Sequence, residues 1–338
     1  MPCVIYHYPC QDGVFAALAA FLGLKEKGAL TFCPLTTWAK PAEKDAIVAS
    51  CAAGDSVYLL DISGGSAFVR ALCAKASGVY LLDHHKAAFE LLEELEASGG
   101  LPATLHPTLS LVKSGCMLAY EHFQAPATLL PLFSLVQDND LFTHALPGSQ
   151  ALAAALGALK LELDPAKAPS LWDALLALDH GALIASGTAL LQQQAAMRAA
   201  EREAAFSVRI PAADAAAPPL QCLALISAHP DLRSEAGAEL AALSAQRGLA
   251  PAGVVAYVED GMGEGMLKVS LRSTGELDVA LVCKAFGGNG HRCVGSRAGT
   301  AGLASQPLKP PPHTYTPPPP HTHTAQECCQ LRAPPQGL

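Results

Sequence analysis

The residues Asp83-His84-His85 follow directly on an apolar run, Val79-Tyr80-Leu81-Leu82. A short unbroken apolar run is typical of a buried strand in a parallel sheet. Carboxylate and imidazole groups are metal ligands, and open α/β folds bind their ligands at the carboxyl edge of the sheet. These residues alone do not distinguish a metal site from a strand that ends in an ordinary polar turn.

Histidines and acids of the same kind stand at the ends of other apolar segments in the N-terminal half. They are His7, Asp12, Asp61, Asp138 and Asp140. Because the carboxyl ends of parallel strands lie on one rim of a sheet, such side chains can converge although they are far apart in the sequence. Every apolar strand expected on that rim, except the second, ends in a residue that can bind a metal ion.

Each of these residues also has a purely structural interpretation. Taken alone, His7 is best interpreted as a hydrogen-bonded histidine of the core. Asp12 and Asp61 could cap the helices that follow them. Asp138 and Asp140 could be ordinary loop acids. The repetition of the pattern along one rim favours a shared site over separate structural roles.

Carboxylates and imidazoles without thiolates suit divalent ions such as Mn²⁺ or Mg²⁺. A carboxylate that bridges two ions about 3.5–4 Å apart, with histidines and further acids around them, forms a two-metal hydrolytic site. Such ions lower the pKa of a water between them and neutralise charge that develops on a phosphoryl oxygen. The pattern therefore indicates metal-assisted hydrolysis of a phosphate compound.

The elements that would position these residues alternate between strands and helices. Strands are expected at 3–8, 31–35, 56–60 and 79–82, and helices at 11–24, 46–53 and 66–76. This alternation predicts an α/β fold with a doubly wound parallel sheet and right-handed crossovers. From residue 110 the pattern becomes helical, with helices expected at 115–123 and 129–136 and the acidic segment 137–142 after them.

Four segments are expected along the chain. They are a catalytic domain at 1–150, a helical connector at 151–205, a smaller α/β domain at 206–300 and a proline-rich tail at 301–338. The smaller domain is expected to hold strands at 220–227, 253–258 and 267–271 and helices at 235–246 and 277–286. In the tail, 10 of 38 residues are proline, a composition typical of disorder.

The composition excludes several classes of protein. A formal charge of -8 argues against a protein that coats duplex nucleic acid through a broad basic surface. The 11 cysteines include no CxxC pair, which argues against a zinc ribbon and fits a reducing compartment. An apolar strand is expected from residue 4, and no apolar run reaches the roughly 18 residues of a membrane span. A cytoplasmic protein without a signal peptide or membrane anchor is expected.

The order of these motifs resembles that of the DHH phosphoesterase superfamily. The resemblance rests on His7 with Asp12-Gly13, Asp61, Asp83-His84-His85 and the segment Asp138-Asn139-Asp140-Leu141-Phe142. A further segment, Gly287-Gly288-Asn289-Gly290-His291-Arg292, resembles the glycine-rich motif of the family's smaller C-terminal domain. The resemblance covers about residues 3–297 and implies a manganese- or magnesium-dependent hydrolase of phosphodiesters, nucleotide phosphomonoesters or phosphoanhydrides.

The resemblance also implies roles for the metal ligands. His7 and Asp12 would each bind one ion, and Asp61 would bridge the two ions. His84 would bind the second ion and Asp138 would complete its shell. If the alignment of the acidic segment with the family motif is shifted by two residues, Asp140 instead of Asp138 would complete the shell of the second ion.

The family likeness assigns two further residues of the first domain to catalysis. Asp83 would support the second ion's shell or bind it weakly. His85 would face the substrate phosphate and donate a proton to the leaving oxygen.

In the smaller domain, the glycines at 287, 288 and 290 would let the backbone approach a phosphate or sugar closely. The residues expected to contact the substrate there are Gly287, Gly288, Gly290, His291 and Arg292, with Arg272 a weaker candidate. An ordinary turn after a helix is the alternative interpretation of this glycine segment.

Two departures from the family pattern stand out. Cys10 occupies a position where many members have a carboxylate ligand. Either it binds an ion as thiolate, which favours a softer metal, or the first ion is held with one charge fewer. After Gly295-Ser296 the family continues into an apolar strand, whereas this chain changes to low complexity.

The function expected from the sequence is a two-metal phosphoesterase that acts on small nucleotides or short single-stranded oligonucleotides in a cleft between two domains. Hydrolysis of pyrophosphate or short polyphosphate is the alternative reaction. A catalytically silent member that binds nucleotide or a partner protein is the alternative from another class. The sequence does not indicate an oligomeric state and leaves a homodimer open.

Overall fold

The computed structural model describes residues 1–211, 219–258, 266–274, 277–285, 289–291, 294–299 and 330–332. The chain forms two compact units, Met1–Gln192 and Gln193–Leu338. Their boundary falls inside a long helix, α9 (His180–Arg202), in the segment expected to connect two domains. The exact four-segment division stays a prediction. None of the helices in the described part of the chain combines the length and apolar character that crossing a bilayer requires.

The first unit is built on a five-stranded parallel sheet. Its strands are β1 (Cys3–His7), β2 (Thr31–Leu35), β3 (Ser56–Leu60), β4 (Gly78–Asp83) and β5 (Leu105–Leu109), in the order β2-β1-β3-β4-β5. This confirms the α/β fold class and the four expected strands of this unit. The fifth strand was not predicted, because Pro107 and the polar residues beside it interrupt the apolar pattern. A proline is tolerated there because β5 lies at the edge of the sheet.

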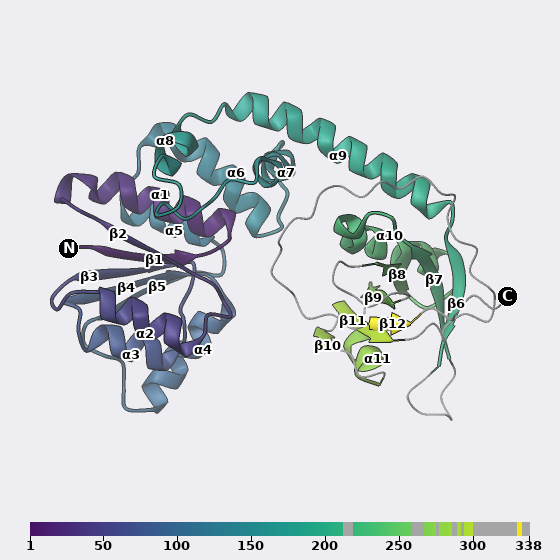
Figure 1. Ribbon diagram of the computed structural model, residues 1–338, viewed down its shortest axis with the longest axis horizontal. Helices are drawn as coiled ribbons and strands as arrows, with labels where there is room; N and C mark the ends of the chain where they lie inside the picture. Colours follow the sequence, from purple (N-terminus) through teal and green to yellow (C-terminus); the bar gives the residue numbers. More distant parts are fainter. Residues whose placement is uncertain are drawn as a thin grey trace. The chain divides into compact units, whose positions relative to one another are not determined.

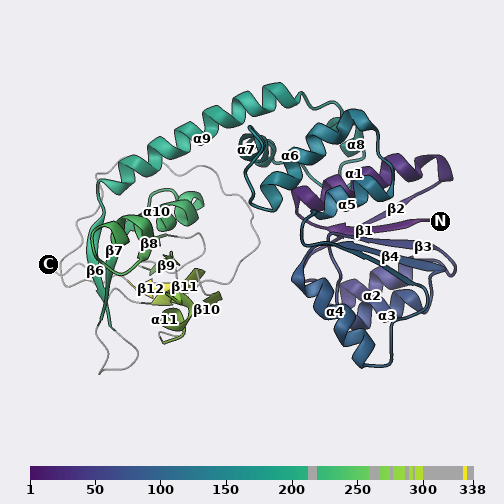
Figure 2. The same cartoon turned by 180° about the vertical axis from the view of Figure 1, so that it is seen from behind.

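Helices cover both faces of this sheet (Figure 1; Figure 2). One face carries α1 (Gln11–Leu24) and α5 (Gly115–His122), and the other carries α2 (Pro41–Ser50), α3 (Ser66–Cys73) and α4 (Lys86–Ala97). Alternation along β1 explains the two layers: Val4 and Tyr6 belong to the core under α1, and Cys3 and Ile5 to the opposite core. All four side chains are at most 1% exposed, so β1 is a central strand buried on both faces.

The order of the strands reverses between β1 and β3, and the carboxyl edge at this point is called the β1–β3 crevice below. The chain passes from β1 to β2 on one side and then returns to place β3 on the other side of β1. In open α/β sheets, ligands bind at the carboxyl ends of strands where the winding reverses in this way. His7 is the last residue of β1 and Asp61 directly follows β3, so the two flank this point.

The remaining helices of the first unit are α6 (Leu130–Asp140), α7 (Ser149–Leu159) and α8 (Leu171–Leu176), with short 3₁₀ turns at Lys25–Lys27 and Ala127–Leu129. A helix was expected to end before the acidic segment. Instead α6 continues through Asp138 and ends at Asp140. This difference decides which of the two acids can face the crevice.

The second unit is a mixed sheet in the order β10-β11-β12-β9-β8-β7-β6. Its strands are β6 (Phe206–Ile210), β7 (Leu220–Ile226), β8 (Ala252–Tyr257), β9 (Met266–Ser273), β10 (Asn289–His291), β11 (Val294–Gly299) and β12 (Gln330–Arg332). A 3₁₀ turn at Pro230–Leu232 leads into α10 (Arg233–Gln246), and α11 (Val279–Ala285) follows β9. Alternation along β7 again serves two cores, since Leu223 and Leu225 pack with α10 while Cys222 and Ala224 pack with α11.

The glycine segment of the second unit is only partly described. Gly287, Gly288 and Arg292 lie outside the described residues, and Gly290 and His291 belong to the backbone of β10. Substrate contacts by these residues therefore stay predictions. Arg272 lies on β9, and its guanidinium donates a hydrogen bond to the Ser234 hydroxyl at 2.8 Å. Of the proline-rich tail, only β12 is within the described residues.

Candidate metal centre

Asp61 lies at the centre of a cluster of ligand side chains at the β1–β3 crevice. It follows β3 with a φ of 60°, in the left-handed region that non-glycine residues seldom adopt. Its backbone N–H donates to the Leu82 carbonyl of the neighbouring strand at 2.8 Å, which fixes this conformation. The carboxyl group is thereby turned into the crevice, and it is 2% exposed.

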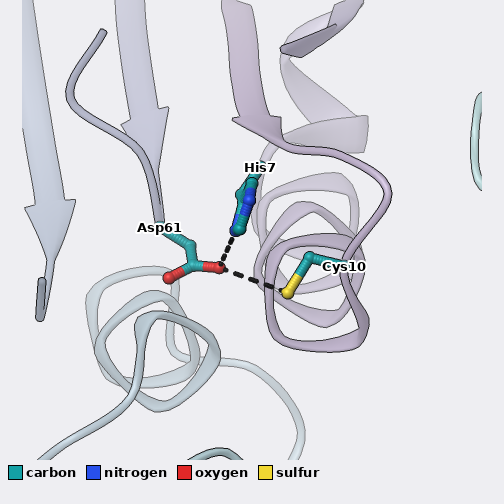
Figure 3. Close-up of side chains that lie close together, drawn as sticks. All are labelled: His7, Cys10 and Asp61. Carbon is teal, nitrogen blue, oxygen red and sulfur yellow. Dashed lines mark hydrogen bonds and ion pairs between the residues drawn. The ribbon is translucent and has the colours of Figure 1, made fainter. Parts of the chain in front are cut away.

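A first ligand group joins His7, Cys10 and Asp61 (Figure 3). His7 Nδ1 lies 3.1 Å from Asp61 Oδ2, and the Cys10 sulfur lies 3.7 Å from the same oxygen. Cys10 is the residue that precedes α1, so the helix start places its side chain beside the end of β1. A Cβ on Gly13 would lie 2.2 Å from the His7 carbonyl oxygen. The glycine of the Asp12-Gly13 pair is therefore needed for this close packing.

A second ligand group joins Asp12, His84 and Asp140. His84 Nε2 lies 3.3 Å from Asp140 Oδ2 and 3.9 Å from Asp12 Oδ2. The three residues come from the first turn of α1, the loop after β4 and the last residue of α6. Segments that are far apart in the sequence thus meet at one rim, as the strand ends predicted.

The two oxygens of Asp61 face different ligand groups. Oδ2 faces His7 and Cys10, whereas Oδ1 lies 3.2 Å from His84 Nε2 and 3.5 Å from His85 Nδ1. A single carboxylate therefore lies between the two groups. This is the arrangement that a carboxylate shared by two cations requires.

Four polar atoms at the centre of the cluster are buried without a hydrogen-bond partner among the described residues: Asp12 Oδ2, Asp61 Oδ1, His84 Nε2 and Asp140 Oδ2. A buried polar atom without a partner costs about 1–3 kcal/mol, so a group of four demands an explanation. Three of the four are carboxylate oxygens, which cannot donate to one another when ionised. Divalent cations between them would satisfy all four atoms, so the residues present fit a metal site.

The charges of the cluster are unbalanced in the absence of a cation. Burial raises the pKa of Asp12 to about 8, and the neighbouring Asp61 and Asp140 add to the shift. Burial also raises the pKa of Asp140, and the negative charge of Asp61 adds to this shift. Burial also acts to raise the pKa of Asp61, but the hydrogen bond with His7 and the close contact with His84 outweigh it and lower this pKa to about 2. Asp61 thus keeps its charge, and its two acidic neighbours need a cation to keep theirs.

Asp138 does not join the cluster, which corrects the choice of this acid as a ligand. Its carboxylate accepts hydrogen bonds from the Thr143 hydroxyl at 2.6 Å and from the backbone N–H groups of Ala145 and Leu146 at 2.9 and 3.1 Å. Burial raises the pKa of Asp138, but the hydroxyl and N–H donors around it lower the pKa below its usual range. Asp138 therefore orders the turn after α6, and Asp140 takes the place in the cluster.

Asp83 acts on the two histidines rather than on the ligand groups themselves. Its Oδ1 accepts hydrogen bonds from the backbone N–H groups of His84 and His85 at 2.7 and 3.0 Å and contacts His85 Nδ1 at 2.8 Å. The contact with Asp83 raises the pKa of His85 to about 9 against the opposing effect of burial. This shift favours the protonated form of His85. Burial lowers the pKa of His84, but the contacts with Asp61 outweigh burial and raise it.

The start of α5 supports the cluster in a way that the sequence did not indicate. The Cys116 N–H donates to Asp12 Oδ1 at 3.1 Å, which leaves Oδ2 for the ligand group. A Cβ on Gly115 would lie 2.5 Å from the Cβ of Asp61 and 2.8 Å from Asp12 Oδ2. Only glycine fits there. A serine and a glycine before an apolar helix were visible in the sequence, but that pattern is common to many helix starts.

Cys10 is held as a neutral thiol in the metal-free cluster. Burial raises its pKa well above the usual value, and the negative charges of Asp61 and Asp12 add to the effect. A thiol that binds a cation is deprotonated by it. Cys10 therefore has the position of a ligand, and which of the two alternatives left open by the sequence holds depends on the cation.

Among the comparisons with known proteins, only the one with solved structures found matches. No protein-family profile matches the sequence, and no curated protein sequence matches it. Among solved structures, an uncharacterized protein from Helicobacter pylori G27 shares 14% identity with a TM-score of 0.35, covering 88% of this chain and 92% of that one. The pGpG-specific phosphodiesterase PggH from Vibrio cholerae shares 10% identity with a TM-score of 0.43, covering 87% and 91%. Both similarities are too low to carry an argument, so the function must be argued from the site.

Proposed function

We propose that this protein is a divalent-metal-dependent phosphoesterase of the DHH type that works with two ions. The observation that carries the proposal is the position of Asp61, whose two carboxylate oxygens face two separate groups of ligand side chains. An aspartate with a purely structural role would not need metal-ligating side chains beside both of its carboxylate oxygens. The four buried atoms without partners support the same conclusion.

One ion would be held by His7, Cys10 and Asp61, and the other by Asp12, His84 and Asp140 with the second oxygen of Asp61. Bound ions in such a site supply Lewis acidity toward a phosphoryl oxygen and activate a water for attack. We expect Mn²⁺, with Mg²⁺ as the alternative, because carboxylate and imidazole ligands predominate.

His85 is suited to act on the leaving group. Its Nδ1 is anchored by Asp83 at 2.8 Å, so Nε2 at the other side of the ring is the atom that can donate a proton. The side chain is 46% exposed, which leaves it open to a substrate, and its raised pKa of about 9 keeps the proton on the ring at neutral pH. Asp83 is then a positioning residue that sets the orientation and charge of His85.

The substrate class that we propose is a small nucleotide or a short single-stranded oligonucleotide. Phe142 follows the ligand Asp140 by two residues, has a φ of 53° and is 81% exposed. An exposed aromatic ring two residues along the chain from a proposed metal ligand offers a surface on which a nucleobase can stack. Pyrophosphate and polyphosphate have no base, so this ring favours nucleotides over phosphoanhydrides.

Cys10 supports one alternative function. Its neutral thiol stands where the related family commonly has a carboxylate, so the first ion is held with less negative charge. Weak binding of that ion would leave a protein that binds nucleotide without cleaving it. We place the protein in the cytoplasm, because scattered single thiols fit a reducing compartment.

The test is an assay of the full chain, first freed of metal and then supplied with Mn²⁺. The substrates to compare are a chromogenic phosphodiester, adenosine bisphosphate, a short oligoribonucleotide and pyrophosphate. We expect turnover of a nucleotide substrate that depends on Mn²⁺ and is lost in Asp61→Asn, while the exposed acid variant Asp45→Asn behaves as wild type. Folded, manganese-loaded protein that turns over none of these compounds would refute the enzymatic function.

A further inference from the structure

A cluster of three cysteine thiols lies at the amino edge of the first unit's sheet. The Cys3 sulfur is 3.4 Å from that of Cys51 and 3.9 Å from that of Cys33. The three residues come from the start of β1, the middle of β2 and the residue after α2. None belongs to the ligand groups at the other end of the sheet.

The fold brings these thiols together on one face of the sheet. In the parallel pairing of β1 with β2, Cys33 lies opposite Ile5, and residues 3 and 5 point to the same face. Cys33 is therefore the diagonal neighbour of Cys3. The end of α2 places Cys51 over the same position from the helical layer, and all three belong to one apolar core.

The three thiols differ in their access to solvent. Cys3 is 1% exposed and Cys51 is 3% exposed, whereas Cys33 is only partly buried. A small molecule in solution would meet Cys33 first. Cys3 touches both other sulfurs, so it can form a disulfide with either of them after a small shift of the side chains.

We propose that Cys33, Cys3 and Cys51 form a thiol–disulfide relay. A small disulfide such as oxidised glutathione reacts at Cys33, and the final product is a Cys3–Cys51 disulfide. The Cys33 thiolate attacks the small disulfide, and one thiol of that molecule leaves. Cys3 then attacks the Cys33 sulfur and expels the second thiol. Cys51 attacks the Cys3 sulfur and releases Cys33 as a thiol. Two protein thiols are oxidised, and one small disulfide is reduced to two thiols.

The surroundings of the cluster favour this chemistry. The sulfur contact with Cys3 lowers the pKa of Cys51 to about 7 despite burial, and the positive charge of Lys75 acts in the same direction. The Lys75 ammonium is held near Cys51 by hydrogen bonds to the carbonyls of Val48 and Ala49 at 2.8 and 3.0 Å. The contact with Cys3 also lowers the pKa of Cys33. Thiolate is the reactive form in disulfide exchange, so Cys33 and Cys51 are activated. The contacts with Cys33 and Cys51, together with burial, raise the pKa of Cys3, so its attack depends on its position against the Cys33 sulfur.

The relay is separate from the proposed metal centre. Cys3 begins β1 and His7 ends it, and four residues of strand span about 13 Å. Oxidation of the thiols can therefore be measured on protein whose metal site has been disabled by Asp61→Asn. Failure of the phosphoesterase assay would not affect the outcome.

The experiment exposes the reduced full chain to oxidised glutathione in the presence of a chelator. Intact mass should show the loss of two hydrogen atoms without a stable glutathione adduct, and peptide mapping should identify Cys3 joined to Cys51. Thermal unfolding should shift upward by several degrees, since the disulfide links positions 48 residues apart and restricts the unfolded chain.

Single variants separate the three roles. Cys33→Ser should slow formation of the Cys3–Cys51 disulfide about tenfold or more, because the two thiols of the cluster that remain are both buried. Cys51→Ser should give a Cys3–Cys33 disulfide instead. Cys3→Ala, which keeps the strand apolar, should stop the reaction at a glutathione adduct on Cys33. Cys73→Ser, in the same core, is the control and should react as wild type.

Three results would overturn the relay. One is a wild-type protein that accumulates only a glutathione adduct. Another is a Cys3→Ala variant that forms an internal disulfide as fast as wild type. The third is one tightly bound zinc ion per chain that persists in Asp61→Asn and blocks oxidation, since this would make the three thiols a metal site.

Discussion

Asp138 and Asp140 lie two residues apart at the end of α6, yet their carboxylates serve different parts of the molecule. Asp140 Oδ2 reaches His84 Nε2 at 3.3 Å, while Asp138 accepts hydrogen bonds from Thr143 and from two backbone N–H groups. Two residues along an α-helix turn the side-chain direction by about 200°. Once the helix extends through the acidic segment, only one of the two acids can face the crevice.

Exchange of the two acids for amides should therefore give opposite results. Asp140→Asn should weaken manganese binding about 100-fold or more and reduce hydrolysis accordingly, with little loss of stability. Asp138→Asn should keep metal content and lower the free energy of unfolding by about 1–3 kcal/mol, because hydrogen bonds to a buried carboxylate are weakened. Isothermal titration with Mn²⁺ and chemical denaturation measure the two effects. A loss of metal in Asp138→Asn with normal binding in Asp140→Asn would reverse the assignment.

The case of α6 shows what the sequence could and could not predict. The central strands were recognisable because each is an unbroken apolar run, and their common rim followed from parallel winding. The end of α6 could not be recognised in the same way, because the polar residues at 137–140 show no apolar periodicity that would extend a helix. The choice between the two acids depended on that helix end.

Other features of the site were hidden for a different reason. The roles of Gly115 and Cys116 come from the packing of α5 against Asp61 and Asp12. The hydrogen bond from Cys116 to Asp12 joins residues 104 positions apart. No local pattern indicates such a contact. The convergence of the thiols at residues 3, 33 and 51 is equally non-local, since scattered single cysteines look alike in the sequence.

Replacement of Gly115 tests the packing of α5 on the cluster. In Gly115→Ala the new Cβ would lie 2.5 Å from the Asp61 Cβ, so the helix or the carboxylate must move. We expect a loss of about 1–3 kcal/mol in stability together with weaker metal binding. Gly157→Ala in α7 is the matched control, because only Gln11 Nε2 lies near the added atom, at 3.9 Å. Normal metal binding in Gly115→Ala would contradict the close approach of α5.

The raised pKa of Asp12 predicts how pH acts on the metal-free protein. Burial raises this pKa from its ordinary value of 3.8 to about 8, so the folded chain binds more protons than the unfolded chain between these pH values. The contribution of Asp12 to stability should therefore be fully present below about pH 4 and should be lost as pH rises toward 8. Denaturation at several pH values measures this slope, and Asp12→Asn should flatten it.

Manganese should reverse the same trend. Binding requires Asp12 and His84 to lose their protons, so the affinity for Mn²⁺ should rise with pH up to about 8, and protons should be released on binding. Titration calorimetry in buffers of different ionisation enthalpy counts these protons. Binding of Mn²⁺ that is independent of pH between 6 and 8 would show that neither group is a ligand.

His85 should affect turnover without affecting metal content. In the proposed mechanism its anchored ring and a pKa of about 9 suit it to donate a proton, so His85→Asn should lower kcat by about 100-fold or more and retain both ions. In the wild type, activity should fall as pH rises above about 9, because His85 then loses its proton. A substrate with a good leaving group, such as a nitrophenyl ester, needs no donor and should rescue the variant. A variant that loses its metal ions instead would make His85 a ligand.

The central claim is that the Asp61 carboxylate is shared by two ions, and metal stoichiometry tests it most directly. Metal analysis of the manganese-loaded chain should give two ions in the wild type and in the exposed acid control Asp45→Asn. Asp61→Ala should lose both ions, whereas His7→Ala should lose mainly the ion on its own side of Asp61. Near-normal metal content in Asp61→Ala, or a single ion in the wild type at saturating Mn²⁺, would contradict the shared carboxylate.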